Sequence, residues 1–408
     1  MLTIYFCTII NKKYIVMNQK KITISLCMAF LFVISCHSQG NDFLSKAKVV
    51  AKKKGELIVC DNSMFKETMV LPLSFFTEEL QMVKLDNADE ALVVNNMVLI
   101  SNNYILVKGR DQVPYKLFDK KTGKYICNIG SVGQGPGEYQ MIYDQQLDEE
   151  NNRIYLLPWF GEKILVYDLK GKVLDPIPLC SNAPKGNFKV DTKAGTLFVS
   201  ALPFEGLNAV VWQQTVKGEL LKSVTPGHLT VPRDFSNEIG AYKLGSMYGF
   251  NVFTFVPRPD SVYHYDVNQN KLIPVFTMEF NSGERSIHSY IETKKYFMGD
   301  FSEIKKIDDY SSTTQNQRYY IVDKQTLKGT FFALENDFLG GMEIGWPIYS
   351  LSGEYYAYNV EPGDLIEALE KVLSENKKMT PEMKSKLTKL KDSVSDSENN
   401  YIFYAKFK

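Results

Sequence analysis

Apolar and polar residues alternate over short stretches along most of the chain, which is typical of half-buried β-strands. One unit recurs five times: a strand that ends in an aromatic residue and usually Asp, a short turn that closes on Gly or Asn, and a second strand. Asp can accept hydrogen bonds from backbone N–H groups two residues on, and Gly or Asn can adopt the positive φ that reverses the chain. The pattern therefore predicts five hairpins, at residues 115–126, 164–174, 209–221, 261–273 and 319–332. The residues expected at the reversals are Gly123, Gly171, Gly218, Asn270 and Gly329.

The spacing of these hairpins indicates a propeller. Asp119 and Asp168 are 49 residues apart, and Asp266 and Asp323 are 57 residues apart. Such a period fits one four-stranded propeller blade, with further strands between the hairpins. A sixth blade can be assembled from residues 80–85, 346–359 and 401–407, where pairing of the early strand with the last one would close the ring. We therefore expect an all-β, six-bladed β-propeller over residues 65–408, or seven blades if residues 65–76 form more than a lead-in.

One segment near the end breaks the β pattern. Apolar residues recur at helical spacing from Asp364 to Glu375, and Thr380 and Pro381 suit the N-cap and first position of a second helix. We expect a small helical insertion at 364–392 in the last blade. It would serve as a cap or spacer, or alternatively as a partner-binding arm.

The N-terminal region has the three parts of an export signal. A basic stretch at 18–21 precedes an apolar run at 22–34, and a polar segment follows Cys36. The sequence Val33-Ile34-Ser35-Cys36 resembles a bacterial lipobox, which implies cleavage before Cys36 and lipidation of that residue. Alternatives are a plain signal peptide with an incidental Cys and a retained membrane anchor. We expect a lipoprotein signal peptide at 1–35 and a tether at 36–64, with Met17 a more natural start than Met1.

Composition narrows the functional classes. Lys and Arg together number 47, as do Asp and Glu, so the chain has no overall basic charge to favour nucleic acid. None of the six Cys forms a C-x-x-C pair and the four His are scattered, so we expect no metal site and no cofactor. The G-x-S-x-G motif of serine hydrolases and the Asp-box repeats of sialidases are absent from the sequence. No catalytic residue can therefore be assigned.

The most distinctive run is Gly130-Ser-Val-Gly-Gln-Gly-Pro-Gly-Glu-Tyr139. Together with the lipobox, the Asp-turn-Gly units and the final segment 401–408, it resembles the six-bladed β-propeller lipoproteins of Bacteroides-type bacteria, which are akin to NHL- and TolB-like propellers. The resemblance implies a fold and a place in the cell envelope. By analogy, His37 after the Cys favours the outer membrane. Because Pro136 removes a backbone donor and strands flank the run, we interpret it as a crossover between blades, or alternatively as a ligand loop, and not as a phosphate loop.

A propeller offers its axial mouth as a binding site, lined by inner strands and by loops between blades. The candidate ligand-binding residues there are Glu138, Tyr139, Trp159, Phe160, Arg258 and Trp346. Aromatic rings beside Arg or Glu suit sugars or peptides. We expect a non-catalytic binding or scaffold module with a monomeric body, which binds a glycan, a peptide or a protein partner. The alternative is a propeller lyase or hydrolase, which would require carboxylate, His and Arg side chains that converge at the mouth.

Overall fold

The computed structural model describes residues 43–408 except 111, 235, 257, 281–285, 308–311 and 346–353. The expected signal peptide, Cys36 and Trp346 therefore lie outside the described residues. Residues 48–408 form one compact unit, which contains the strands of the sheets.

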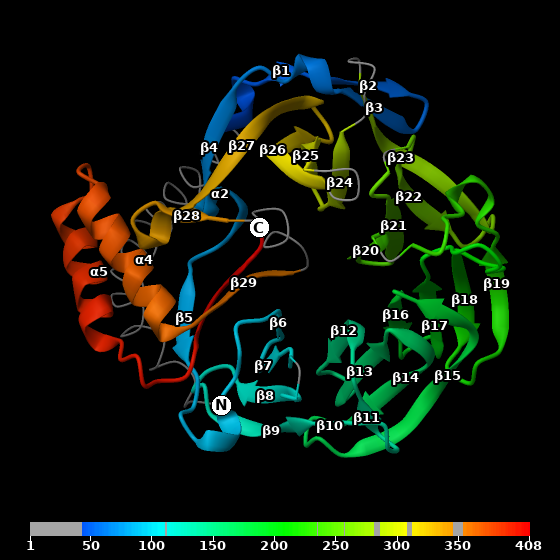
Figure 1. Ribbon diagram of the computed structural model, residues 1–408, viewed down its shortest axis with the longest axis horizontal. Coiled ribbons are helices and arrows are strands. Elements are labelled where there is room, and N and C mark those ends of the chain that lie inside the picture. Colours follow the sequence, from blue (N-terminus) through cyan, green and yellow to red (C-terminus); the bar gives the residue numbers. More distant parts are fainter. Residues whose placement is uncertain are drawn as a thin grey trace, which may run out of the picture. The chain divides into compact units, whose positions relative to one another are not determined.

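Five four-stranded antiparallel sheets form the blades of a propeller, and in each the strands follow one another in chain order (Figure 1). The first blade contains β6 (Val98–Ile100), β7 (Tyr104–Val107), β8 (Tyr115–Asp119) and β9 (Tyr125–Ile129). The second contains β12 (Ile142–Asp148), β13 (Arg153–Pro158), β14 (Phe160–Tyr167) and β15 (Val173–Pro184). The third contains β16 (Asn187–Asp191), β17 (Thr196–Ser200), β18 (Val211–Thr215) and β19 (Leu220–Val224). The fourth contains β20 (Glu238–Leu244), β21 (Met247–Phe253), β22 (Val262–Asp266) and β23 (Lys271–Glu279). The fifth contains β24 (Ile287–Glu292), β25 (Tyr296–Lys306), β26 (Ser312–Asp323) and β27 (Lys328–Asn336).

Additional strands extend two of the blades. In the fourth blade, β3 (Leu57–Asp61) pairs in parallel with β23 and carries β2 (Ala51–Lys54) on its other side. In the fifth blade, β27 pairs with β1 (Lys48–Val49), β4 (Thr68–Pro72) and β28 (Met342–Ile344). The structure thus places most of residues 48–61 of the expected tether in paired strands. These pairings cover sheet edges that would otherwise present free backbone groups.

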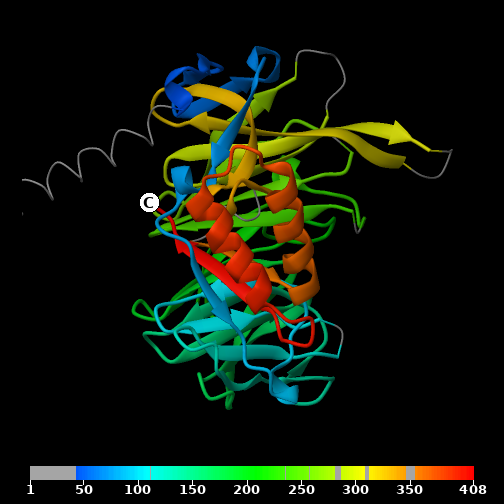
Figure 2. The ribbon, with the colours of Figure 1, turned by 90° about the vertical axis from the view of Figure 1, so that its left-hand side faces the viewer.

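The expectation of six blades is wrong, because the residues that the structure describes form five. In the sixth position lies a three-stranded sheet of β29 (Tyr355–Val360), β30 (Tyr401–Lys406) and β5 (Gln81–Lys84), between the fifth blade and the first (Figure 1). Among the described residues this sheet has one strand fewer than each blade, and helices α4 (Pro362–Glu375) and α5 (Pro381–Ser393) lie in the chain between β29 and β30. The early strand β5 pairs with β30, as ring closure requires. Figure 2 shows α4 and α5 side by side, and the long β25–β26 hairpin projecting beyond the rest of its sheet.

The turns of the five hairpins depend on local side-chain contacts. The Asp266 carboxylate accepts from the backbone N–H groups of Asn268 and Gln269, and Asn270 follows with a φ of 49°. In the fifth hairpin the expected reversal at Gly329 is wrong, because Leu327 takes the positive φ, at 58°. Gly329 lies within β27. A shorter turn than expected therefore precedes that strand.

The inner strands of neighbouring blades are joined through side chains. Asp144 and Gln146 of β12 accept hydrogen bonds from the backbone N–H groups of Phe188 and Val190 in β16, at 2.8 and 2.9 Å. Asn187 of β16 donates in turn to a backbone oxygen of β20. These bonds satisfy backbone groups at the inner edges, while apolar residues fill the space between blades. The ends of the inner strands are therefore held in fixed positions around the axis.

Candidate functional site

The loop that ends at Glu138 is held in place by hydrogen bonds between its own residues. It connects two short parallel strands, β10 (Ser131–Val132) and β11 (Glu138–Tyr139). The Glu138 carboxylate accepts from the Gly135 N–H at 2.8 Å and from the Ser131 hydroxyl at 3.2 Å. These contacts hold the glycine-rich run between the first and second blades in a tight fold.

Tyr139 is hydrogen-bonded to the third and fourth strands of the first blade. Its buried hydroxyl donates to the backbone oxygen of Ile129 at 2.7 Å and accepts from the N–H of Tyr115 at 2.8 Å. Burial raises the pKa of Tyr139 well above its ordinary value, so the hydroxyl stays neutral and can donate. The residue also lines a cavity of about 560 Å³, together with Lys108 and Arg110.

Arg258 fastens a loop. Its guanidinium donates to the backbone oxygens of Leu229 and Thr230, both at 2.8 Å. Trp159 and Phe160 touch each other, with ring centroids 4.2 Å apart. The structure thus brings together Trp159 with Phe160, and Glu138 with Tyr139, while Arg258 is engaged in a separate loop. A ligand-binding role for these residues stays a prediction.

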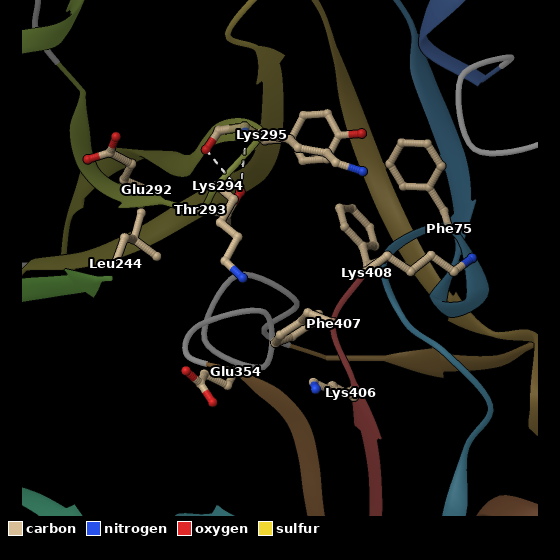
Figure 3. Close-up of a pocket in the computed structure, with 12 residues that line it drawn as sticks. Phe75, Leu244, Glu292, Thr293, Lys294, Lys295, Glu354, Lys406, Phe407 and Lys408 are labelled. Atoms are coloured by element: carbon tan, nitrogen blue, oxygen red, sulfur yellow. Dashed lines mark hydrogen bonds between the residues drawn. The ribbon is translucent and has the colours of Figure 1, made fainter. Parts of the chain in front are cut away.

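A pocket that the sequence did not predict lies where the chain ends (Figure 3), and Figure 1 shows the C-terminus near the middle of the ring. Its volume is about 240 Å³. The helix α2 (Leu73–Phe76), the end of β20, the β24–β25 turn and the end of β30 contribute its walls. We call it the lysine pocket. Its lining residues are Phe75, Phe76, Leu244, Glu292, Thr293, Lys294, Lys295, Tyr296, Glu354, Lys406, Phe407 and Lys408.

Aromatic rings form one wall of the lysine pocket. Phe75 lies edge-on to Phe76, with centroids 4.7 Å apart, and both rings lie within 6.0 Å of the Tyr296 ring. Burial, with a smaller contribution from the charge of Asp323, raises the pKa of Tyr296 to about 12. Its hydroxyl is therefore neutral at physiological pH. This wall is apolar and already packed.

Positive charge dominates the rest of the lysine pocket. Four lysines and two glutamates line it, so the side chains sum to +2. Within the described part of the chain, Lys294, Lys295 and Lys406 form no ion pair, whereas the Lys408 ammonium donates to the backbone oxygen of Ser74 at 2.5 Å. Figure 3 shows the Lys294 side chain directed toward the part of the pocket that Phe407 and Glu354 line. The pocket therefore presents ammonium groups without carboxylate partners.

The buried carboxylate of Glu292 is neutralised from outside the pocket. It accepts from Lys324 Nζ at 2.6 Å and from His264 Nε2 at 2.7 Å. Burial alone would raise the pKa of Glu292, but the hydrogen bonds and positive charges of His264 and Lys324 outweigh burial and lower it. Glu292 is therefore ionised and its charge is already balanced by Lys324.

The lysine pocket could not be found from sequence because its residues are far apart in the chain. A local signal is present in two places, where lysines stand beside an aromatic residue: Lys294-Lys295-Tyr296 and Lys406-Phe407-Lys408. Nothing in either triplet shows that the two meet. Their meeting depends on the return of β30 to the middle of the ring.

The described residues also bear on metal binding and on membrane spanning. The described residues contain no group of three or more His, Cys, Asp or Glu side chains placed to hold a metal ion. Among the same residues, no helix is both long and apolar enough to cross a membrane.

Comparisons with known proteins follow the fold. The model of a family described as a domain of unknown function (DUF4934) matches residues 56–406. The chain is similar to the crystal structure of a protein described as exported, from Bacteroides fragilis NCTC 9343, with a TM-score of 0.54 and 16% identity over 86% of this chain and 99% of that one. It is also similar to a member of the DUF4221 family from Bacteroides vulgatus ATCC 8482, with a TM-score of 0.41 and 12% identity over 81% of this chain and 97% of that one. No curated protein matches the sequence.

Proposed function

Because this chain belongs to the DUF4934 family, a domain of unknown function, we propose a function from its lysine pocket: non-catalytic binding of a ligand that carries a carboxylate or sulfate group. The observation that carries the proposal is the set of ammonium groups without carboxylate partners beside an aromatic wall. A glycan that contains uronic acid or sulfate, or the acidic end of a peptide, has this chemistry.

Charge supports an anionic ligand. The pocket side chains sum to +2, and Glu292 among them is already paired with Lys324 outside the pocket. Hydrogen bonds between ammonium and carboxylate groups are roughly twice as strong as neutral ones. An anion would therefore relieve the mutual repulsion of the lysines and gain strong hydrogen bonds.

Size supports a small group. A volume of about 240 Å³ lies below the usual range for a drug-sized ligand. One sugar residue or one acidic side chain would fit, and the rest of a longer ligand would lie outside. The aromatic wall would contact the apolar part of the bound group.

We further propose a place in the cell envelope for this binding module. The export signal at 1–35 and the lipobox at Cys36 support a lipid-anchored protein, held at the outer membrane by analogy. The Bacteroides fragilis protein of similar fold is described as exported, which agrees with this location. A relation to NHL- and TolB-like propellers is part of the same proposal.

The lyase or hydrolase alternative is less well supported. Such an enzyme needs a carboxylate that is free to act as acid, base or nucleophile. Of the two carboxylates that line the lysine pocket among the described residues, Glu292 is bound by two protein donors, which leaves Glu354 as the one carboxylate available there for such chemistry.

Calorimetry and thermal unfolding with trigalacturonic acid test the proposal, with maltotriose as the neutral analogue. We expect the acidic trisaccharide, or a peptide of Glu residues as second probe, to bind and to raise the Tm, since a ligand bound only to the native state stabilises it. We expect any binding of maltotriose to be the same whether or not the pocket lysines are present. If neither acidic probe raises the Tm, the proposal is wrong.

A further inference from the structure

The Glu238 carboxylate stands at the other end of β20 from the lysine pocket. β20 begins at Glu238 and ends at Leu244, which lines that pocket. The strand has seven residues, so at about 3.3 Å per residue its ends lie roughly 20 Å apart. Any site at Glu238 is therefore separate from the lysine pocket.

Two other elements hold this carboxylate in place. Lys185, in the connection between β15 and β16, donates to Glu238 Oε1 at 2.5 Å and to the backbone oxygen of Asn237 at 2.8 Å. The Tyr143 hydroxyl of β12 lies 3.1 Å from both carboxylate oxygens. Burial and the Glu238 charge raise the pKa of Tyr143 well above its ordinary value, so its hydroxyl donates as a neutral group.

The backbone departs from regular geometry at both of these partners. Tyr143 lies at a β-bulge, since Ile142 pairs with Pro158 while Asp144 pairs with Leu157. Lys185 has a φ of 51°, which is uncommon for a residue with a side chain. Bulges re-aim side chains, and strained backbone gathers at functional sites. Here both irregular residues point to one carboxylate.

An aromatic pair is attached to the same network. The Trp159 backbone oxygen accepts from the Lys185 N–H at 3.1 Å. The Phe160 ring lies against Trp159 at an interplanar angle of 72° and is 57% exposed. So large an exposed apolar ring, on the residue that follows Trp159, offers a platform for a ligand.

A purely structural role for the Lys185–Glu238 ion pair would not explain why the Glu238 side chain is exposed. The Lys185 side chain is only 4% exposed, but that of Glu238 is 44% exposed. A carboxylate has about four acceptor positions, and Lys185 and Tyr143 use only some of them. Glu238 therefore keeps acceptor capacity toward solvent, mainly on Oε2.

We propose that Glu238, Trp159 and Phe160 form a second binding site, which takes a neutral sugar residue of a glycan. Lys185 cancels the charge of Glu238, so the site has no net charge with which to select an ion. Sugar hydroxyls donate to the open carboxylate positions. The C–H groups on a sugar ring face carry slight positive charge, which is attracted to the negative face of an aromatic ring.

Affinity electrophoresis of the protein in gels that contain β-glucan, galactomannan, xylan or starch tests this site. We expect at least one of these neutral polysaccharides to retard the wild-type protein. We expect Phe160→Ala to lower the affinity obtained from the retardation about tenfold, which corresponds to a loss of about 1.4 kcal/mol of binding free energy. Glu238→Gln keeps the shape of the side chain and should weaken binding similarly. Lys377→Ala, an exposed lysine between α4 and α5, is the control, and its retardation relative to its mobility in a gel without polysaccharide should equal that of the wild type.

A fluorescence titration with the retarding polysaccharide provides a second readout. The chain has three tryptophans, of which Trp159 lies in the proposed site and Trp212 is buried in the core, so both proteins carry Trp346→Phe. In that background, binding should shift the emission of the protein that keeps Trp159 and not that of Trp159→Phe. Phe160 is exposed, so its replacement should leave the Tm unchanged and separate loss of binding from loss of folding. Retardation by none of the four polysaccharides, or equal retardation of wild type and Phe160→Ala, would overturn the proposal. The proposal would also be overturned if poly-lysine bound to the protein in a manner that depends on Glu238 and none of the polysaccharides bound.

Discussion

Lys324 Nζ lies 2.6 Å from Glu292 Oε1, and the carboxylate that it neutralises has a side chain only 3% exposed. Glu292 ends β24 and Lys324 follows β26, so the ion pair joins the first and third strands of one blade at the edge of the lysine pocket. His264 of the fourth blade donates to the other carboxylate oxygen. The Glu292 carboxylate therefore links two blades. Because Lys324 neutralises this carboxylate, its charge does not offset the charges of the pocket lysines.

This linkage predicts a pH dependence of stability. The pKa of Glu292 is lower in the folded protein than in the unfolded chain, so its contribution is fully present above the unfolded value of about 4.3 and is lost as pH falls through the folded value. Urea unfolding of wild type and Glu292→Gln from about pH 7 to about pH 3 measures it. We expect Glu292→Gln to be less stable at neutral pH and the difference to shrink as the pH falls. A difference that stays constant would contradict the argument.

The partner lysine gives a second prediction. Replacement in Lys324→Met leaves a buried carboxylate with His264 as its remaining partner, so we expect the free energy of unfolding to fall by about 2 kcal/mol. Denaturant unfolding at neutral pH measures the loss. Lys377→Ala, an exposed lysine between α4 and α5, is the control and should change stability by less than about 0.5 kcal/mol.

Binding in the lysine pocket should depend on Lys294 and Lys295 and on salt. Loss of a hydrogen bond to a charged group costs about 1.5–3 kcal/mol, so we expect Lys294→Ala to weaken binding of trigalacturonic acid at least about tenfold. Raising the salt concentration from about 0.05 M to about 0.5 M should also weaken binding by the wild type, because these lysines are exposed and screened. Calorimetry measures both effects, with Lys377→Ala as control. Affinity that is insensitive to salt would count against an anionic ligand.

Local features of the fold could be predicted because each depends on residues near one another in sequence. The Asp119 carboxylate accepts from the N–H of Thr122, and Gly123 then takes a φ of 70°. The helical spacing after β29 likewise places helices at 364–375 and 380–391, and the structure has α4 and α5 at 362–375 and 381–393. In the third hairpin, Thr215 replaces Asp and its hydroxyl accepts from the N–H of Lys217.

Features that depend on distant contacts could not be predicted. The number of blades depends on how many strands meet in the sheet of β29, β30 and β5, whose strands come from distant parts of the chain. The lysine pocket combines residues from the 70s, the 290s and the 400s, which meet only in the folded ring. The carboxylate of Glu238 gave no sequence signal, because its partners Lys185 and Tyr143 are 53 and 95 residues away.

Gly329 lies in β27 and not in the turn of the fifth hairpin, and its close packing there gives a prediction about stability. A Cβ at Gly329 would lie 2.6 Å from Val50 Cγ2 and 2.7 Å from the Ile321 backbone oxygen. We therefore expect Gly329→Ala to lower the free energy of unfolding by about 1–3 kcal/mol, as overpacking does. Gly345→Ala is the control, since nothing lies within 4 Å of its Cβ. Thermal unfolding of both variants measures the difference, and equal Tm values would show that Val50 can move aside.

The helical pair is packed against the last sheet, and this predicts that the two unfold together. Leu369 of α4 is fully buried in a cluster that includes Val360 of β29 and Phe403 of β30. Truncation in Leu369→Ala should lower the free energy of unfolding of the whole propeller by about 2–5 kcal/mol, because the cavity falls in a core shared with the sheet. Glu367→Ala, exposed on the same helix, should change it by less than about 0.5 kcal/mol. Calorimetric unfolding of Leu369→Ala shows whether the helices and the sheet unfold together.

We expect a single transition at lower temperature than in the wild type, because the helices and the sheet share one cooperative core. A main transition at the wild-type temperature, preceded by a separate one at lower temperature, would mean that the helices are an independent arm.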